Sequence, residues 1–183
     1  ERDDEVGKLV RGFNFLIAKL RREEVARRES DERLKFMAHH DALTGLYNRV
    51  MLEEHLQQAL ARAERDNTQI ALLFCDLDGF KIINDQYGHD VGDEVLRQVA
   101  TRLLLDRRRV DTVARLGGDE FVILLSGLED ARTAASHVAQ QCLAAINVPF
   151  EIDGKSLTLG ISIGIALHTG KAVAPSCPVS YTH

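Results

Sequence analysis

Residues 115–121 read Arg-Leu-Gly-Gly-Asp-Glu-Phe, and two apolar runs flank this heptapeptide. Val113-Ala114 precedes it, and Val-Ile-Leu-Leu at 122–125 follows. Apolar runs on either side of a Gly-Gly pair predict a tight β-hairpin, since glycine adopts the positive φ that such turns need. Asp119 and Glu120 place two carboxylates beside bare backbone, which suits Mg²⁺, a cation that proteins usually bind together with phosphates. An ordinary acidic hairpin turn is the alternative that these residues alone leave open.

A second informative stretch begins with the unbroken apolar run 70–75. This run predicts a strand buried on both faces, and Asp76 and Asp78 follow it on the same side, just past its end. Asp78 is expected to be the N-cap of a helix that begins near Phe80. Asp76 has no such structural role and would face the acidic hairpin if the two strands pair. Lys81 adds a cation on the first helical turn, where free backbone amides favour phosphate.

Further short motifs accompany these two stretches, and each of them is weak on its own. They are Asp41-Ala-Leu-Thr-Gly-Leu-Tyr-Asn-Arg49, Asn84-Asp85, Gly88-His89 and Gly92-Asp93. With 76–81 and 117–121, in this order and spacing, the chain resembles the GGDEF-domain diguanylate cyclases over roughly residues 36–168. In that family two GTP molecules condense into cyclic di-GMP and release two pyrophosphates, with Mg²⁺ or Mn²⁺ as cofactor.

The resemblance implies roles for the acidic residues. Asp76, the Leu77 carbonyl and Asp119 would hold the metal ions. Asp119 would also be the base for the attacking 3′-hydroxyl, and Glu120 would support the metal site. The chemistry is phosphoryl transfer, in which positioning and charge neutralisation supply most of the catalysis.

The resemblance also implies how the nucleotide is held. The terminal phosphates would contact the Lys81 side chain and the backbone amides of Gly79 and Phe80. Asn84 and Asp93 would read guanine, because an amide and a carboxylate pair with its O6 acceptor and its N1 and N2 donors, which adenine lacks. His89 stands at a nucleotide contact of the family. From the residues alone, turn formation and helix capping remain an alternative for Asn84 and Asp93.

An Arg-x-x-Asp sequence, Arg108 to Asp111, precedes the acidic hairpin at a position where many family members bind the product and are inhibited by it. A guanidinium binds phosphate or a guanine edge through two hydrogen bonds, and a carboxylate accepts from guanine's N1 and N2 donors. The alternative is a basic helix C-terminus at 107–109 that interacts with the helix dipole.

Composition excludes some classes of protein. The 183 residues are 45% hydrophobic and 28% charged, which fits one catalytic domain with an appendage. The net charge of −5 argues against a general nucleic-acid binder, so the guanine-reading residues indicate a free nucleotide. The three cysteines are scattered, which favours reduced cytosolic thiols; they are Cys75, Cys142 and Cys177. We find neither a run of membrane-spanning length nor a signal peptide.

Residues 1–40 are expected to form a signalling helix. Apolar residues recur at spacings of three and four between 5 and 20, and residues 21–35 are almost entirely charged. Such a long, exposed helix is expected to pair with a second copy of itself. Residues 4–14 resemble the end of a HAMP signalling module, which implies a cytoplasmic domain of a bacterial inner-membrane receptor whose membrane segments lie upstream. A solvated helical linker that dimerises weakly is the alternative.

The remaining elements predict an α+β (α/β) domain at 41–169, a palm-like, ferredoxin-like mixed sheet covered by helices. Helices are expected at 49–67, 91–107 and 130–146. Strands are expected at 149–152 and 157–167, joined by a turn at Asp153-Gly154.

Residues 170–183 depart from the family pattern, which continues into a helix whose Lys and Arg reach the phosphates. Pro175 and Pro178 oppose a helix there, so we expect an irregular tail after a C-terminally truncated domain. Weak GTP binding and slow turnover would follow. The leading hypothesis is a diguanylate cyclase working as a homodimer, because each active site needs two facing halves. The alternatives are a catalytically impaired domain that binds GTP or cyclic di-GMP, and a coiled-coil relay.

Overall fold

The computed structural model describes residues 19, 21–25, 27–28, 34, 36–169 and 179–181. The chain divides into two compact units, residues 1–38 and 39–183. In the first unit every described residue is helical, as expected for a helix there, and the signalling role of this helix stays a prediction. The HAMP-like residues 4–14 lie outside the described residues. Among the helices that are described, none combines the length and the apolar character needed to cross a membrane.

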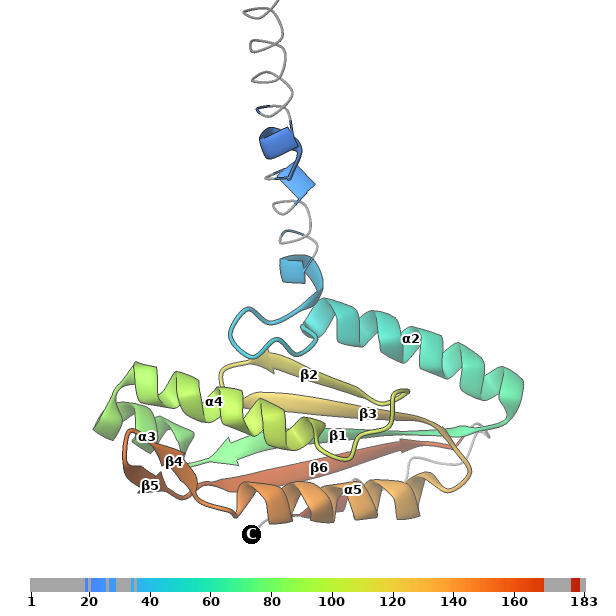
Figure 1. Cartoon of the computed structure of the whole chain (residues 1–183). Helices are drawn as coiled ribbons and strands as arrows, with labels where there is room; N and C mark the ends of the chain where they lie inside the picture. The colour runs from blue at the N-terminus through green and yellow to red at the C-terminus, as the bar shows by residue number, and fades with distance from the viewer. Residues whose placement is uncertain are drawn as a thin grey trace, which may run out of the picture. The chain divides into compact units, whose positions relative to one another are not determined.

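The second unit is built on a five-stranded sheet (Figure 1). The strand order is β2-β3-β1-β6-β7, and every neighbouring pair is antiparallel. The α+β class predicted from the sequence is confirmed, but the sheet is antiparallel throughout and not mixed as predicted. The strands in this spatial order are β2 (Thr112–Gly117), β3 (Glu120–Leu128), β1 (Gln69–Asp78), β6 (Gly160–His168) and β7 (Val179–Tyr181).

Helices cover the two faces of this sheet unequally (Figure 1). Helix α2 (Arg49–Asp66) packs on one face, over β2, β3 and the start of β1. The other face carries α4 (His89–Leu104) and α5 (Ala131–Ile146), with the short α3 (Phe80–Tyr87) joining β1 to α4. Most of the hydrophobic core lies under α4 and α5.

Strand β1 has one face that is buried along the strand and one that is buried only at its start. Side chains from Ala71 to Leu77 that point toward α4 and α5 are almost completely buried. On the opposite face α2 covers the start of the strand, but Phe74 is 49% exposed, and Asp76 and Asp78 are exposed as well. The prediction of a strand buried on both faces was therefore wrong beyond residue 73, because α2 covers only part of that face.

The helices begin and end close to their predicted bounds. Asn48 caps α2, since its side chain accepts from the Met51 amide, and Asp130 caps α5 by accepting from the Thr133 amide. Helix α4 ends at Leu104, three residues before the predicted bound, so residues 107–109 lie beyond it.

The region after α5 differs from the prediction in two respects. The turn at Asp153-Gly154 is confirmed, with φ of 49° and 74°, but it joins β4 (Phe150–Ile152) to β5 (Lys155–Leu157) in a separate hairpin. The single strand predicted at 157–167 is thus two strands, β5 and β6. The tail is also not irregular throughout, because β7 pairs with β6 there.

Candidate active site at the acidic hairpin

The predicted β-hairpin is present, and its turn is Gly118-Asp119 between β2 and β3. Gly117 and Gly118 have φ of 149° and 52°, in the region that glycine adopts without a steric penalty. Glu120 is the first residue of β3 and pairs with Gly117 across the turn. The hairpin therefore places two carboxylates at one end of the sheet.

Asp76 lies beside this hairpin, as expected from the sequence. It is opposite Glu120 on β3 and opposite Ser162 on β6. Partial burial raises the pKa of Asp76, and so do three neighbouring negative charges, those of Asp119, Asp78 and Glu120. Mutual repulsion of this kind is relieved by a bound cation.

The donor set suits a metal ion that arrives with its substrate. Among the described residues, no group of three or more His, Cys, Asp or Glu is arranged to hold a metal by itself. Mg²⁺ usually keeps several waters and is bound through one or two carboxylates together with substrate phosphates. Asp76 and Asp119 fit that pattern. Leu77 lies one residue beyond the last pair of the β1–β3 ladder, and its side chain is buried.

Asp78 does not have the role that the sequence predicted. The N-cap of α3 is Gly79, at φ 82°, and no side chain caps this helix. Asp78 is the last residue of β1, and both of its carboxylate oxygens accept from the Ser162 hydroxyl, at 2.9 and 3.1 Å. The N-cap prediction was wrong because the strand continues through Asp78 and holds its carboxylate against β6.

The predicted phosphate contacts gather at the start of α3. Phe80 and Lys81 are its first two residues, Phe80 is buried, and Lys81 is exposed. The first N–H groups of a helix have no partner within it, and they attract anions. Gly79 is the N-cap of α3, and no side chain hydrogen-bonds to the amides at this end of the helix.

The two predicted guanine-reading residues come from different helices. Asn84 lies in α3 and Asp93 in α4, and both are half-buried. A Cβ atom built on Gly92 would lie 1.9 Å from the Asn84 side-chain oxygen, so the Asn84 amide rests against bare backbone. Neither helix has a side-chain N-cap, and the capping residues are glycines. Capping therefore does not account for Asn84 or Asp93. His89 is the first residue of α4 and is exposed.

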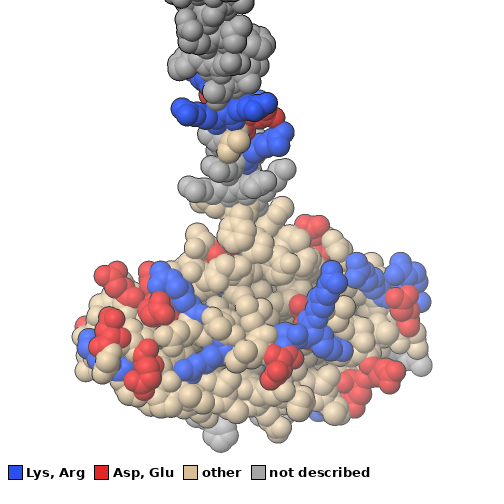
Figure 2. All heavy atoms as spheres, viewed as in Figure 1, with Lys and Arg blue, Asp and Glu red and all other residues tan. Residues whose placement is uncertain are grey.

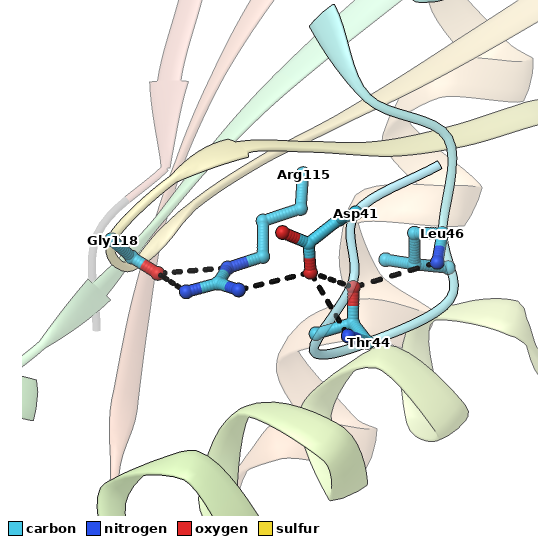
Figure 3. A network of polar contacts seen from close by, with 5 residues as sticks. All are labelled: Asp41, Thr44, Leu46, Arg115 and Gly118. Carbon is cyan, nitrogen blue, oxygen red and sulfur yellow. Dashed lines mark hydrogen bonds and ion pairs between the residues drawn. The ribbon is translucent and has the colours of Figure 1, made fainter. Parts of the chain in front are cut away.

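A polar network that the sequence reasoning missed supports the hairpin (Figure 3). The guanidinium of Arg115 donates to the Gly118 carbonyl at 3.0 and 2.7 Å and to Asp41 Oδ1 at 2.9 Å. The same Asp41 oxygen accepts from the Thr44 amide and hydroxyl. Burial raises the pKa of Asp41, but the hydrogen bonds from Thr44 and Arg115 outweigh it and hold the pKa below the usual value. The only signal in the sequence was that both residues belong to quoted motifs.

The Arg-x-x-Asp sequence forms a closed turn. Arg108 and Asp111 are joined by a side-chain ion pair at 3.1 Å, and Asp111 also accepts from the Arg108 amide at 3.0 Å. The Asp111 side chain is 3% exposed and that of Arg108 is 51% exposed. The turn lies beyond α4, so a contact with the helix dipole does not account for it. Both Asp111 oxygens are held by Arg108, and guanine would have to displace this pair to reach them.

Two hollows flank this turn. One, of about 320 Å³, adjoins Asp111 and is lined also by Arg62 and Arg109. The other, of about 530 Å³, adjoins Arg108 and is lined also by residues 127–130, Thr133 and His137. On the face drawn in Figure 2, basic and acidic side chains of the described residues are intermixed.

Comparison with known proteins identifies the family to which this antiparallel sheet and its acidic hairpin belong. Residues 38–175 match the family model described as "Diguanylate cyclase, GGDEF domain". The chain belongs to this family.

Three relatives illustrate the similarity. The chain is 46% identical to MucR of Pseudomonas aeruginosa, a bifunctional diguanylate cyclase/cyclic di-GMP phosphodiesterase, over 73% of its own residues and 19% of that protein. It is 39% identical to diguanylate cyclase TpbB of the same species, over 94% of this chain and 40% of that protein. The solved GGDEF domain of TpbB superposes with a TM-score of 0.69 at 44% identity, covering 71% and 76% of the two chains. The solved structure of the coiled coil and GGDEF domain of DgcB from Caulobacter crescentus, in complex with c-di-GMP, superposes with a TM-score of 0.72 at 27% identity. The match covers 84% of this chain and 82% of that one.

Proposed function

We propose that this domain is a diguanylate cyclase that condenses two GTP molecules into cyclic di-GMP. The 3′-hydroxyl oxygen of each GTP attacks the α-phosphorus of the other, and two pyrophosphates leave. The observation that carries the proposal is the arrangement of Asp76 opposite Glu120, with Asp119 in the adjoining turn. Membership of the family supports it. The chain spans less than half of the length of MucR and of TpbB, so the activity of the whole protein remains part of the proposal.

Asp76, Asp119 and the Leu77 carbonyl would hold Mg²⁺ or Mn²⁺, with Glu120 supporting the site. The bound metal ion would neutralise phosphate charge and polarise the phosphoryl group. Asp119 would accept the proton of the attacking hydroxyl. Repulsion among the carboxylates favours metal binding, since the site carries excess negative charge before a cation arrives.

The helices α3 and α4 would orient GTP. The Asn84 amide and the Asp93 carboxylate would pair with guanine, and Gly92, which has no Cβ, leaves room for the Asn84 side chain. Lys81 and the amides at the start of α3 would hold the terminal phosphates; these amides belong to Gly79 and Phe80. His89, exposed at the start of α4, would contact the nucleotide.

A homodimer is the proposed working form. Each chain offers one set of GTP contacts, whereas the product contains two guanosine units, so two copies must face each other. The helical residues before position 39 would bring the copies together. In the full receptor, the HAMP-like segment would connect this cytoplasmic domain to an inner-membrane sensor.

Product feedback is proposed at Arg108 and Asp111. The exposed guanidinium and the adjoining hollow would receive a phosphate or guanine edge of cyclic di-GMP. A solved relative, DgcB, carries c-di-GMP in its structure. Binding would open the Arg108–Asp111 pair and replace it with contacts to the ligand.

Incubation with GTP and Mg²⁺, followed by mass spectrometry, tests the proposal. Cyclic di-GMP should form with the wild type and not with Asp119→Asn or after metal chelation. A second function, binding of GTP or cyclic di-GMP without turnover, is favoured by Pro175 and Pro178, which occupy the place of the family's phosphate-binding helix. Calorimetric binding of GTP without formation of cyclic di-GMP would support this second function and exclude the first.

A further inference from the structure

Three consecutive arginines follow α4, and their side chains make different contacts. Asp106 has φ 58°, a left-handed conformation, so the chain changes direction just before Arg107. Arg108 pairs with Asp111, and Arg109 lines the hollow beside Asp111. Arg107 is the one whose side chain turns back toward α5.

Arg107 is half-buried and makes two side-chain hydrogen bonds. Its Nε donates to the Leu105 carbonyl at 3.0 Å, and its Nη2 donates to the Gln141 side-chain oxygen on α5 at 2.7 Å. Burial raises the pKa of the Cys75 and Cys142 thiols, and the positive charge of Arg107 opposes that rise in both. The guanidinium is also held directly against α5 by its hydrogen bond to Gln141.

This placement carries a cost. Within the described part of the chain, Nη1 of Arg107 is buried and has no hydrogen-bond partner. A long arginine side chain near the surface ordinarily keeps its charged end in water. A buried donor without a partner is unfavourable, so the remaining two contacts must offset its desolvation. This unpartnered donor belongs to the residue directly before the turn formed by residues 108–111.

We infer that Arg107 is a positioning residue for the product-binding turn, which it anchors to α5. The inference rests on the proposed feedback function of Arg108 and Asp111. A turn held in one orientation binds its ligand without first being ordered. Without the Arg107 contact, only a fraction of the molecules would hold the turn in the orientation that binds cyclic di-GMP. The apparent affinity is the intrinsic affinity multiplied by that fraction.

The test is calorimetric binding of cyclic di-GMP to the full chain. Arg107→Met and Gln141→Leu cut the same contact from its two sides, and each should weaken binding about tenfold. The double variant should be no weaker than Arg107→Met alone, because the residues act through one contact. Binding of GTP with Mg²⁺ should stay unchanged, since the turn lies outside the acidic site.

Arg102 supplies the matched control. It ties the end of α4 to the last turn of α5 and to the chain after it, by donating to the Ala145 and Pro149 carbonyls, and its guanidinium carbon lies 3.7 Å from the centre of the Phe150 ring. Arg102→Met should lower the thermal midpoint but change cyclic di-GMP affinity by less than about twofold.

Different variants test the product-binding role of Arg108 and the anchoring role of Arg107. If Arg108→Ala leaves cyclic di-GMP binding unchanged, the product site itself is misplaced. If Arg108→Ala abolishes binding while Arg107→Met and Gln141→Leu bind like the wild type, the anchoring role is wrong. Equal weakening by Arg102→Met and Arg107→Met would also overturn it, because general destabilisation would then explain both. If Arg107→Met does not fold, Gln141→Leu carries the test.

Discussion

Asp41 and Arg115 form an ion pair with 2.9 Å between Oδ1 and Nη1, although they lie 74 residues apart in the chain. Both side chains are largely enclosed, with 22% and 10% exposed. The other guanidinium nitrogens of Arg115 donate to Gly118, the residue before Asp119. The segment that precedes α2 is therefore linked directly to the acidic hairpin.

Asp41→Asn should destabilise the fold by about 1–2 kcal/mol at neutral pH, because it weakens hydrogen bonds to a charged acceptor. The folded pKa of Asp41 lies below the unfolded value of 3.8, so this stabilisation is present above that pH and is lost as the pH falls through the folded pKa. Urea unfolding from neutral pH downward should show the difference between the two proteins closing in acid. Asp66→Asn, at an exposed pair with Arg65, is the control and should change stability little. A difference that stayed constant with pH would refute the assignment.

Asp76→Asn and Asp119→Asn should each abolish cyclic di-GMP formation while the fold persists. Each change removes a carboxylate from the end of the sheet, and without metal Asp76→Asn should keep or slightly raise the thermal midpoint, since it relieves repulsion. Product assays and thermal melting check both effects. Glu53→Gln, at an exposed acid on α2, should behave as wild type. Full activity in either site variant would remove that residue from the mechanism.

Gly92→Ala should reduce selectivity for guanine. The new methyl group would collide with the Asn84 side chain and displace its amide, although alanine suits a helix interior better than glycine. The wild type should prefer GTP over ATP by at least about tenfold, and the variant should lose most of that preference. Nucleotide titrations measure it. In an Asn84→Ala background, Gly92→Ala should have little further effect, and a large additional loss there would contradict the proposed collision.

Arg108→Ala should weaken binding of cyclic di-GMP and leave GTP binding at the acidic site intact. It should also cost about 1–2 kcal/mol of stability, because the nearly enclosed Asp111 carboxylate loses the side chain that pairs with it. Calorimetry and urea unfolding give the two values. Arg132→Ala, at an exposed arginine of α5, is the control. Unchanged product affinity in Arg108→Ala would leave the ion pair as a purely structural feature of the turn.

The sequence predicted features whose causes are local. The hairpin at Gly117 and Gly118 follows from backbone freedom between two apolar runs, and its pairing brought Asp76 to Glu120 as expected. The apolar spacing similarly predicted helices close to α2 and α5. The family motifs then identified which of these side chains gather at one end of the sheet.

Features that depend on distant packing were not predictable in this way. The exposure of Phe74 depends on how much of the sheet α2 covers. The role of Asp78 depends on Ser162, a residue of β6 that is 84 positions away. The three arginines at 107–109 look alike in the sequence. Their separate directions follow from the left-handed Asp106 and from Gln141 on α5.

The stoichiometry of the reaction shows whether this domain condenses two GTP molecules into cyclic di-GMP. The protein is incubated with equal GTP and ATP in Mg²⁺, and cyclic dinucleotides and pyrophosphate are quantified together by mass spectrometry and an enzymatic pyrophosphate assay. We expect two pyrophosphates for each cyclic di-GMP, with ATP unconsumed. Loss of GTP without cyclic di-GMP, or equal consumption of ATP, would contradict it.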